Sequence, residues 1–328
     1  MVDVARRARV SLKTVSRVVN REPGVAEATA ERVRATIEAL SFRRHEGAAH
    51  LRRGSTTASL GVVLMDIANP FYSALTRAVE EVAVGHGFLV FAGSSDEDVV
   101  RERQLALALC ARRVDGLLVV PAGHDQRYLR AEVSAGTPVV FVDRPGLGLS
   151  ADAVLVDNAG GVRAAVEHLA AHGHRRIAFL GDNPAIYTAR ERLAGFGQGM
   201  VAIGRPGDAG LVEMGPHTAP SIGAALARFR SERHPVTALV TGNNRITVLV
   251  LRALATMRGW RPALIGFDDL ELADLLRPSL TVIEQDASAL GRIAAELLFA
   301  RIAGDQRPAQ RVVLPTRLVP RGSGERSA

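Results

Sequence analysis

The sequence contains one cysteine, no membrane-length apolar run and no export signal. Cys110 has no partner for an internal disulfide, and its apolar neighbours favour a buried, unreactive thiol. A bilayer span needs roughly 18 uninterrupted apolar residues, which the chain does not offer. The N-terminus lacks a basic stretch followed by an apolar run and a small-residue cleavage site. We therefore expect a cytoplasmic protein with no membrane partner.

The sequence also lacks the short motifs of common enzymes. It has no phosphate loop, no G-x-G-x-x-G after a strand, no H-E-x-x-H and no cysteine pair. His168 and His172 lie one helical turn apart, with His174 close behind, but no acidic or cysteine residue accompanies them in the sequence. Adjacent Asp268 and Asp269 would point oppositely in extended chain, so they form no acid–base pair. We expect no metal, no cofactor and no catalytic residues.

Lysine is represented by Lys13 alone, so the positive charge comes from arginine and is unevenly distributed. Residues 1–57 carry twelve Lys or Arg against six Asp or Glu, which is +6 of the net charge of +7. The remaining residues are therefore almost neutral. Such a basic segment gains free energy beside a phosphate backbone by releasing counterions. This asymmetry predicts a nucleic-acid-binding segment at the N-terminus.

The basic segment has the pattern of three short helices. Residues 3–8 form the first, Ser11 is a suitable N-cap for a second that runs from residue 12 to about 20, and a third begins near 27 or 29. Ala5 offers the small residue that a close helix crossing needs, and Val15 and Val18 point inward. These features predict a helix-turn-helix that binds the major groove of double-stranded DNA. The candidate DNA contacts share the outer side of the second helix: Ser11, Leu12, Lys13, Thr14, Ser16, Arg17 and Asn20.

After residue 58 short apolar runs alternate with helical patterns. The first runs are residues 60–65, 88–92, 116–120 and 139–142, and the helical patterns between them are 71–84, 99–112 and 126–135. A second series has strands near 177–180, 238–240 and 263–265 and helices near 158–171, 189–202, 219–230 and 244–257. This alternation indicates βαβ units. We predict an α/β fold with two doubly wound parallel sheets, and pairs of such sheets bind ligands between them.

Several motifs resemble the LacI/GalR family of bacterial transcription regulators. They are VDVARRARVSLKTVSRVVN at 2–20, DIANPFY at 66–72, RRVDGLLVVP at 112–121, HGHRRIAFLG at 172–181, RERLAGF at 190–196, LIGFDDLELADLLRPSLTVIEQD at 264–286 and LPTRLV at 314–319. The resemblance covers essentially the whole chain in the family's order. It implies an all-α helix-turn-helix head followed by a two-lobed core like a periplasmic binding protein. It also implies a repressor that binds a palindromic operator as a homodimer under the control of a small-molecule effector, in this family most often a sugar.

The resemblance also divides the chain. It implies a head at 1–41, a hinge helix at 42–57 and a core at 58–328, with an N-subdomain of 58–156 and 285–314, a C-subdomain of 157–284 and 315–320, and a tail at 321–328. In the hinge, Leu51 matches the leucine that the family wedges into the minor groove, and His50 lies beside it. Arg44 and His45 replace the family's Pro-Asn there. The chain begins about five residues late relative to the family, and we expect a slightly longer natural N-terminus.

The effector candidates follow predicted strand ends or match family positions that contact ligand. They are Asp66, Asn69, Phe71, Tyr72, Asp157, Thr188, Arg192, His217, Asn243, Asp268 and Gln285. Other roles stay open for some of them: helix packing for Phe71, a solvated surface for Arg192 and a turn cap for Asp268. Two departures from the family stand out, because Arg9 replaces a turn glycine and Asn244 an aspartate. Arg9 would then adopt a positive φ at a cost of about 1 kcal/mol.

Two other classes of function are compatible with an α/β core. A ligand-binding protein of the periplasmic sugar-binding type would share the two lobes but would need an export signal and no head. A hydrolase or sugar-modifying enzyme would require a nucleophile or an acid pair in the cleft. The basic helical head favours the regulator over both.

Overall fold

The computed structural model describes residues 1–19, 22–40, 56–205 and 211–328. The chain divides into two compact units, a head at Met1–Thr57 and a core at Ala58–Ala328. The α/β fold class with a helical head and a two-lobed core is confirmed. The predicted hinge falls almost wholly on residues 41–55, which lie outside the described residues, and so do Asn20, His50 and Leu51.

The head consists of three helices around a small apolar core. These are α1 (Val2–Ala8), α2 (Leu12–Val19) and α3 (Glu27–Ala39). Val4, Val15 and Val33 come from different helices and are fully buried against each other. Arg9 links α1 to α2 with a φ of 52°, the left-handed conformation that a glycine adopts more readily. The predicted strain at this position is therefore present.

The N-lobe contains a six-stranded parallel sheet in the order β11-β5-β4-β3-β1-β2. Its strands are β1 (Ser59–Leu64), β2 (Leu89–Ser94), β3 (Gly116–Val119), β4 (Val139–Val142), β5 (Asp152–Val156) and β11 (Arg311–Leu314). Helices α5 (Pro70–Gly85) and α12 (Ala287–Ile302) cover one face. Helix α6 (Val99–Ala111), a 3-10 turn at Arg127–Leu129 and α7 (Arg130–Ser134) cover the other. Cys110 is buried there, and burial raises the pKa of its thiol to about 11.

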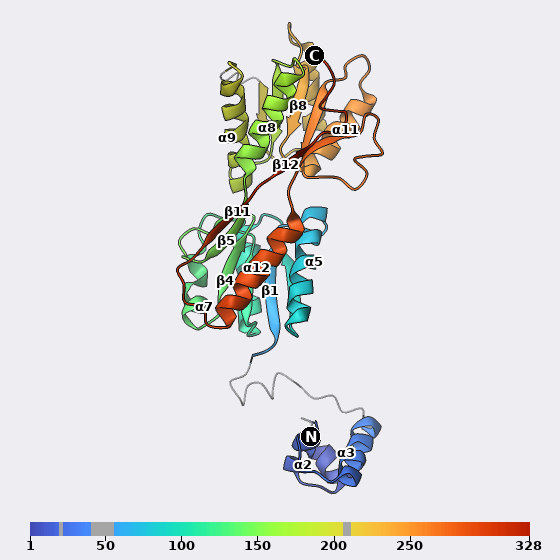
Figure 1. Cartoon of the computed structure of the whole chain (residues 1–328), viewed down its shortest axis with the longest axis vertical. Helices are drawn as coiled ribbons and strands as arrows, with labels where there is room; N and C mark the ends of the chain where they lie inside the picture. The colour runs from blue at the N-terminus through green and yellow to red at the C-terminus, as the bar shows by residue number, and fades with distance from the viewer. Residues whose placement is uncertain (20–21, 41–55, 206–210) are drawn as a thin grey trace. The chain divides into compact units, whose positions relative to one another are not determined.

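The C-lobe repeats this architecture with the sheet order β12-β10-β9-β8-β6-β7. Its strands are β6 (Ile177–Gly181), β7 (Val212–Met214), β8 (Ala238–Thr241), β9 (Ala263–Phe267), β10 (Thr281–Glu284) and β12 (Arg317–Val319). Helices α8 (Asn158–Ala171) and α9 (Tyr187–Ala202) cover one face, and α10 (Ala219–Ser231) and α11 (Asn244–Thr256) the other. The antiparallel β12 closes one edge of this sheet. Figure 1 shows the two lobes of the core.

The chain passes between the lobes three times. It leaves β5 for α8, returns from β10 to α12, and leaves β11 for β12. Parallel strands of each lobe therefore end toward the junction, where ligands of doubly wound sheets bind. Residues 321–328, interpreted from the sequence as a tail, are not a free end. Ser323 is buried between β9 and β10, and its carbonyl accepts from the amide of Leu264 at 2.9 Å.

None of the helices among the described residues is both long enough and apolar enough to cross a membrane.

Candidate functional site

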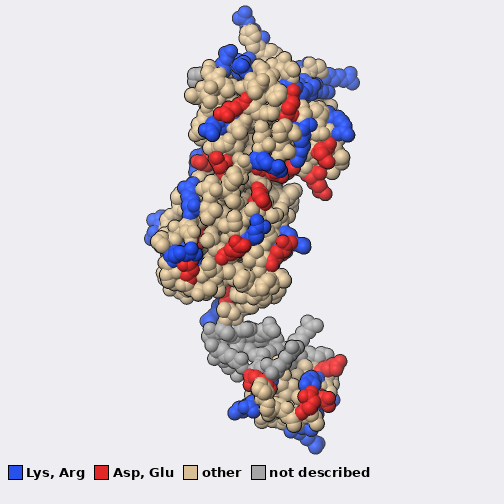
Figure 2. Space-filling view, in the orientation of Figure 1, with Lys and Arg blue, Asp and Glu red and all other residues tan. Residues whose placement is uncertain are grey.

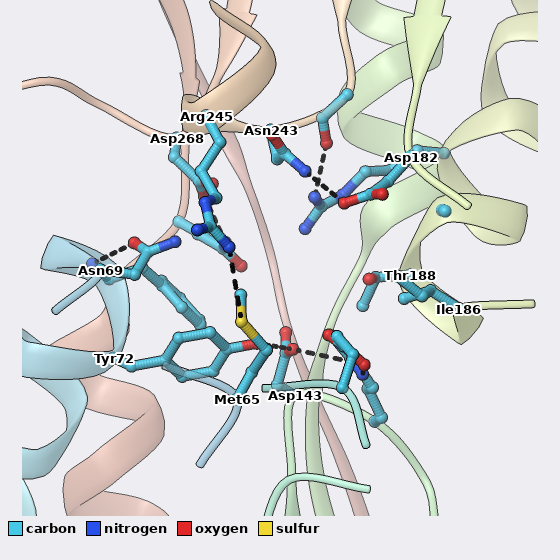
Figure 3. A pocket seen from close by; sticks show the side chains of 17 residues that line it. Met65, Asn69, Tyr72, Asp143, Asp182, Ile186, Thr188, Asn243, Arg245 and Asp268 are labelled. Carbon is cyan, nitrogen blue, oxygen red and sulfur yellow. Dashed lines mark hydrogen bonds and ion pairs between the residues drawn. The ribbon is translucent and has the colours of Figure 1, made fainter. Parts of the chain in front are cut away.

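A cavity lies at the junction of the two lobes, and strand ends and helix starts from both lobes supply its lining. Figure 3 shows Tyr72 and Asp143 from the N-lobe facing Asp182, Asn243 and Asp268 from the C-lobe. About 40 Å³ of the cavity is open to water-sized molecules. This is room for a few waters only. A sugar can enter only if the lobes or the lining side chains move apart.

Arg192 of α9 is a buried cation in the wall of the cavity. Its Nε donates to Asn158 Oδ1 at 2.7 Å and its Nη1 donates to the carbonyl of Gly242 at 2.6 Å. The guanidinium carbon lies 3.7 Å from the centre of the Phe267 ring, which adds a cation–π attraction. Burial lowers the pKa of Arg192, and the nearby charges of Asp268 and Asp143 oppose that effect. Arg192 therefore lies fixed in the wall, not on a solvated surface.

A chain of polar side chains follows β4 in the opposite wall. Tyr72 donates its hydroxyl to Asp143 Oδ2 at 3.0 Å, and Arg144 donates to both oxygens of Glu97, with 2.7 Å from Nη1 to Oε2. Arg144 Nη1 also donates to the carbonyl of Pro121. Burial raises the pKa of the Asp143 carboxyl, while the charges of Arg144 and Arg192 act against this. Burial likewise keeps Tyr72 protonated by raising its pKa.

Three buried polar atoms that line this cavity have no hydrogen-bond partner in the described part of the chain. They are Asp143 Oδ1, Gln285 Oε1 and Arg144 Nε. A buried polar group without a partner costs about 1–3 kcal/mol. Two acceptors and one donor around one cavity therefore form a set that a hydroxyl-bearing ligand could satisfy.

Asp268 follows β9 with a φ of 69°, a left-handed conformation that is unusual for a residue other than glycine. Its carboxylate accepts from Gln285 Nε2 and, at 3.4 Å, from the amide of Asn244. The extended backbone predicted for these two aspartates is therefore wrong at Asp268. The two carboxylates nevertheless diverge, because Asp269 is turned away to pair with Arg321.

The lobes touch directly at the mouth of the cavity. Asn69 Nδ2 donates to Asn244 Oδ1 at 3.2 Å, and Asn244 Nδ2 donates to Asn69 Oδ1 at 2.8 Å. Both side chains are buried. Arg245 reaches from α11 toward Asp66, with its Nη2 3.7 Å from Oδ2. The amide pair and the ion pair join the beginning of α11 to the loop before α5.

Most of the predicted effector residues lie together in the lining. They are Asn69, Phe71, Tyr72, Thr188, Arg192, Asn243, Asp268 and Gln285. Three do not line the cavity. Asp66 pairs with Arg245, Asp157 caps α8 by accepting from the amide of Gly160, and the His217 ring bonds the carbonyl of Gly181. His217 instead lines a neighbouring groove that shares Asp182, Asn243 and Arg245 with the cavity.

Sequence reasoning missed about half of the lining. The missed residues are Met65, Glu97, Asp143, Arg144, Asp182, Ile186, Ala189, Gly242 and Arg245. Asp143 and Arg144 directly follow the predicted strand 139–142, so the strand-end rule could have found them. Glu97 is 47 residues from its partner Arg144 in the sequence, and only the fold brings them together.

The histidine cluster also has partners that the sequence did not reveal. His168 Nε2 lies 2.5 Å from Glu325 Oε1, and His174 contacts Thr237 and the carbonyl of Arg326. An acidic partner is therefore present, supplied by the C-terminal segment. Among the described residues no group of His, Cys, Asp and Glu has the arrangement of a metal site.

The head presents a second candidate site along α2. Ser11 caps this helix by accepting from the amide of Thr14 at 3.1 Å. Val15 is fully buried, whereas Leu12 is 45% exposed and Lys13 is exposed beside it. Thr14, Ser16 and Arg17 are half-buried. The first turn of α2 thus offers an apolar and a cationic side chain to the surroundings, and Figure 2 shows basic side chains on the head surface in that view.

Comparisons with known proteins match both the head and the core. Residues 1–45 match the family described as "Bacterial regulatory proteins, lacI family", and residues 166–324 match a "Periplasmic binding protein-like domain". The HTH-type transcriptional regulator PtxS of Pseudomonas plecoglossicida is 36% identical over 98% of this chain and 94% of its own length.

Two solved structures extend this similarity to three dimensions. The transcriptional regulator CelR–cellobiose complex superimposes with a TM-score of 0.72 at 30% identity, and 98% of each chain is covered. The lac repressor dimer bound to operator and the anti-inducer ONPF superimposes with a TM-score of 0.82 at 27% identity, again with 98% of each chain covered.

Proposed function

The chain belongs to the LacI family of bacterial regulatory proteins, and we propose that it is a cytoplasmic repressor. Proteins of this family are transcription regulators and not enzymes. The proposed repressor binds a palindromic operator as a dimer and responds to a sugar in the cleft between its lobes. The observation that carries the effector proposal is the set of buried, unpartnered polar atoms around the cavity. The observation that carries the DNA proposal is the exposed first turn of α2 on a basic head.

The polar lining suits a neutral, polyhydroxylated ligand. Asp143 Oδ1 and Gln285 Oε1 would accept from hydroxyl groups, and Arg144 Nε would donate to one. The carboxylate of Asp268, at the end of β9, would accept from a pair of hydroxyls. Cellobiose in the CelR complex is a ligand of this chemical class. These contacts support a sugar more than a flat, sparsely hydroxylated nucleobase.

An exposed apolar surface supports the dimer. Leu89 and Phe91 lie two residues apart on β2, so they point to the same side of this edge strand, and they are 68% and 49% exposed. Val84 at the end of α5 and Val99 and Val100 at the start of α6 are also exposed. We propose that these side chains contribute to a surface that a second copy covers, since contiguous exposed apolar patches mark protein–protein interfaces. A second copy would also supply the second head that a palindrome requires.

A gel-shift experiment tests the DNA proposal. Palindromic duplexes with a central CG and randomised arms are selected with the full chain, and the bound duplex is retested with variants. Lys13→Ala and Arg17→Ala should each weaken binding at least about fivefold, because a base contact contributes roughly 1–3 kcal/mol. Arg34→Ala, which removes an exposed ion pair with Glu27 on α3, serves as the control. If no duplex is retarded at low salt, even by a chain with a longer N-terminus, the proposal of a DNA-binding repressor is refuted.

A thermal-shift screen tests the effector proposal. The ligands are D-ribose, D-glucose, D-xylulose and cellobiose, with hypoxanthine and guanine as nucleobase comparisons. A sugar should raise the melting temperature of the wild type, and Asp268→Ala and Arg192→Ala should abolish that shift. An unchanged shift in both variants would place the ligand elsewhere.

A further inference from the structure

The C-terminal segment 320–326 is built into the C-lobe, and Figure 1 shows the chain end at the outer end of that lobe. Ser323 bridges two strands: the amide of Leu264 donates to its carbonyl at 2.9 Å, and the amide of Thr281 donates to its Oγ at 2.8 Å. The Thr281 hydroxyl donates to Glu325 Oε2 at 2.8 Å and accepts from the amide of Arg321 at 3.0 Å. The segment is therefore held in one place on β9 and β10.

From this fixed position Arg321 reaches the loop that follows β9. Its Nη1 and Nη2 each donate at 2.6 Å to one oxygen of Asp269, a bidentate pair. Such fork-to-fork pairs have a defined geometry in addition to their charge. The Arg321 bonds lower the pKa of Asp269, so its carboxylate is ionised at neutral pH. Asp269 Oδ1 also accepts from the amide of Leu270 at 2.8 Å, which tightens the loop.

Asp269 immediately follows Asp268, whose backbone is in the left-handed region at a φ of 69°. A non-glycine residue there costs of order 1 kcal/mol or more, and it stays there only if its surroundings hold it. On one side, the Asp268 amide donates to the carbonyl of Ile283 at 2.9 Å. On the other side, Arg321 holds the neighbouring Asp269. The Asp268 carboxylate also accepts from Gln285 Nε2 and the amide of Asn244, and these bonds need the backbone at 268–269 to keep its direction.

We propose that Arg321 is a positioning residue for the effector site, which holds the Asp268 carboxylate in the cavity through its bidentate pair with Asp269. The proposal rests on the proposed function insofar as Asp268 contacts the effector. Arg321 itself does not line the cavity. The C-terminal segment thereby becomes a determinant of effector affinity.

Hydrogen–deuterium exchange of the full chain tests the positioning without any ligand. Arg321→Ala should raise the exchange rates of the amides at 267–270 about tenfold or more, the effect of losing one charge-assisted bidentate pair. Arg228→Ala removes a similar but exposed pair with Glu213 on the same lobe, 2.6 Å long, and should leave those amides unchanged. Unchanged exchange in Arg321→Ala would overturn the proposal whether or not any sugar binds.

Effector affinity gives the second measurement, with the same four sugars as probes. Arg321→Ala and Asp269→Asn should each lower the affinity for the sugar that binds the wild type about tenfold. The double variant should bind that sugar no more weakly than either single variant, because the two residues act as one unit. Arg321→Lys keeps the charge but loses the fork, and should fall between Arg321→Ala and wild type. Operator affinity without sugar should not change.

The two proposals fail in different ways. If no sugar binds the wild type, the sugar effector is wrong, while the exchange experiment still decides the role of Arg321. If a sugar binds and Arg321→Ala keeps wild-type affinity, the positioning role is wrong. Additive losses in the double variant, or an equal loss in Arg228→Ala, would also contradict it.

Discussion

Replacement of Arg192 by methionine is the sharpest perturbation of the cavity wall. Methionine approximates the length of the aliphatic part of arginine, so packing against Phe267 is largely kept. The change removes the donors to Asn158 Oδ1 and to the carbonyl of Gly242. Both acceptors then remain in a buried wall, facing a cavity that can admit a few waters.

The expected loss of stability follows from these contacts. Each buried acceptor left without a donor costs about 1–3 kcal/mol, and the lost cation–π contact adds about 1 kcal/mol. Against this, the variant no longer has to bury a charge, which offsets part of the loss. We expect a net loss of about 3 kcal/mol. This is a large fraction of a typical domain stability of roughly 5–15 kcal/mol.

Urea unfolding followed by tryptophan fluorescence measures this loss. Trp260 is the single tryptophan of the chain, and its Nε1 donates to the carbonyl of Val236 within the C-lobe, so its emission reports the lobe that holds Arg192. Arg190→Met, two residues earlier on the exposed side of α9, is the matched control and should change stability by less than about 0.5 kcal/mol. Equal stability of the two variants would refute the interpretation of Arg192 as a buried, fixed cation.

Three further predictions concern the head, the lobe contact and pH. Arg9→Gly relieves a φ of 52°, so the head should become more stable by about 1 kcal/mol. The amides of the head should then exchange about fivefold more slowly, and unchanged exchange would contradict this. Asn244→Ala removes both bonds to Asn69 and should increase the radius of gyration in small-angle scattering as the lobes separate, whereas an identical radius would show that the pair does not hold them. Because the folded pKa of Asp143 is raised, its contribution to stability is complete below the unfolded value of about 3.9 and is lost as pH rises through the folded value. Tyr72→Phe removes a hydrogen bond that favours the ionised form of Asp143, so the pKa of Asp143 should rise further and the loss of stability should extend to higher pH. Identical curves of stability against pH for the variant and the wild type would refute this role of Tyr72.

Local signals in the sequence were sufficient for most of the helices. The helix predicted at 158–171 has those bounds in the structure, because Asp157 caps its start by accepting from the amide of Gly160. The second helix of the head begins at Leu12 as predicted, after the Ser11 cap. Such caps are contacts between residues three apart, so a sequence displays them directly.

Contacts between residues that lie far apart in the sequence could not be predicted. The three-residue strands β7 and β12 give no periodic signal, and the packing of residues 321–326 depends on strands some 40 to 60 positions earlier. The divergence of Asp268 and Asp269 was predicted on a wrong premise, because Asp268 has a positive φ and its amide bonds the distant Ile283 carbonyl, while Asp269 pairs with the distant Arg321. Asp157 and His217, which the sequence also suggested, do not line the cavity, and their polar atoms bond backbone groups instead.

Fluorescence anisotropy of a selected operator duplex, titrated with the full chain with and without a sugar that stabilises it, tests the central claim most directly. The account predicts tight operator binding in one condition and an affinity that differs at least about fivefold in the other, since coupling free energies between such sites are roughly 1–3 kcal/mol. It also predicts that Asp268→Ala binds the operator normally and loses the response. Operator affinity that is indifferent to a sugar bound in the cleft would contradict the account.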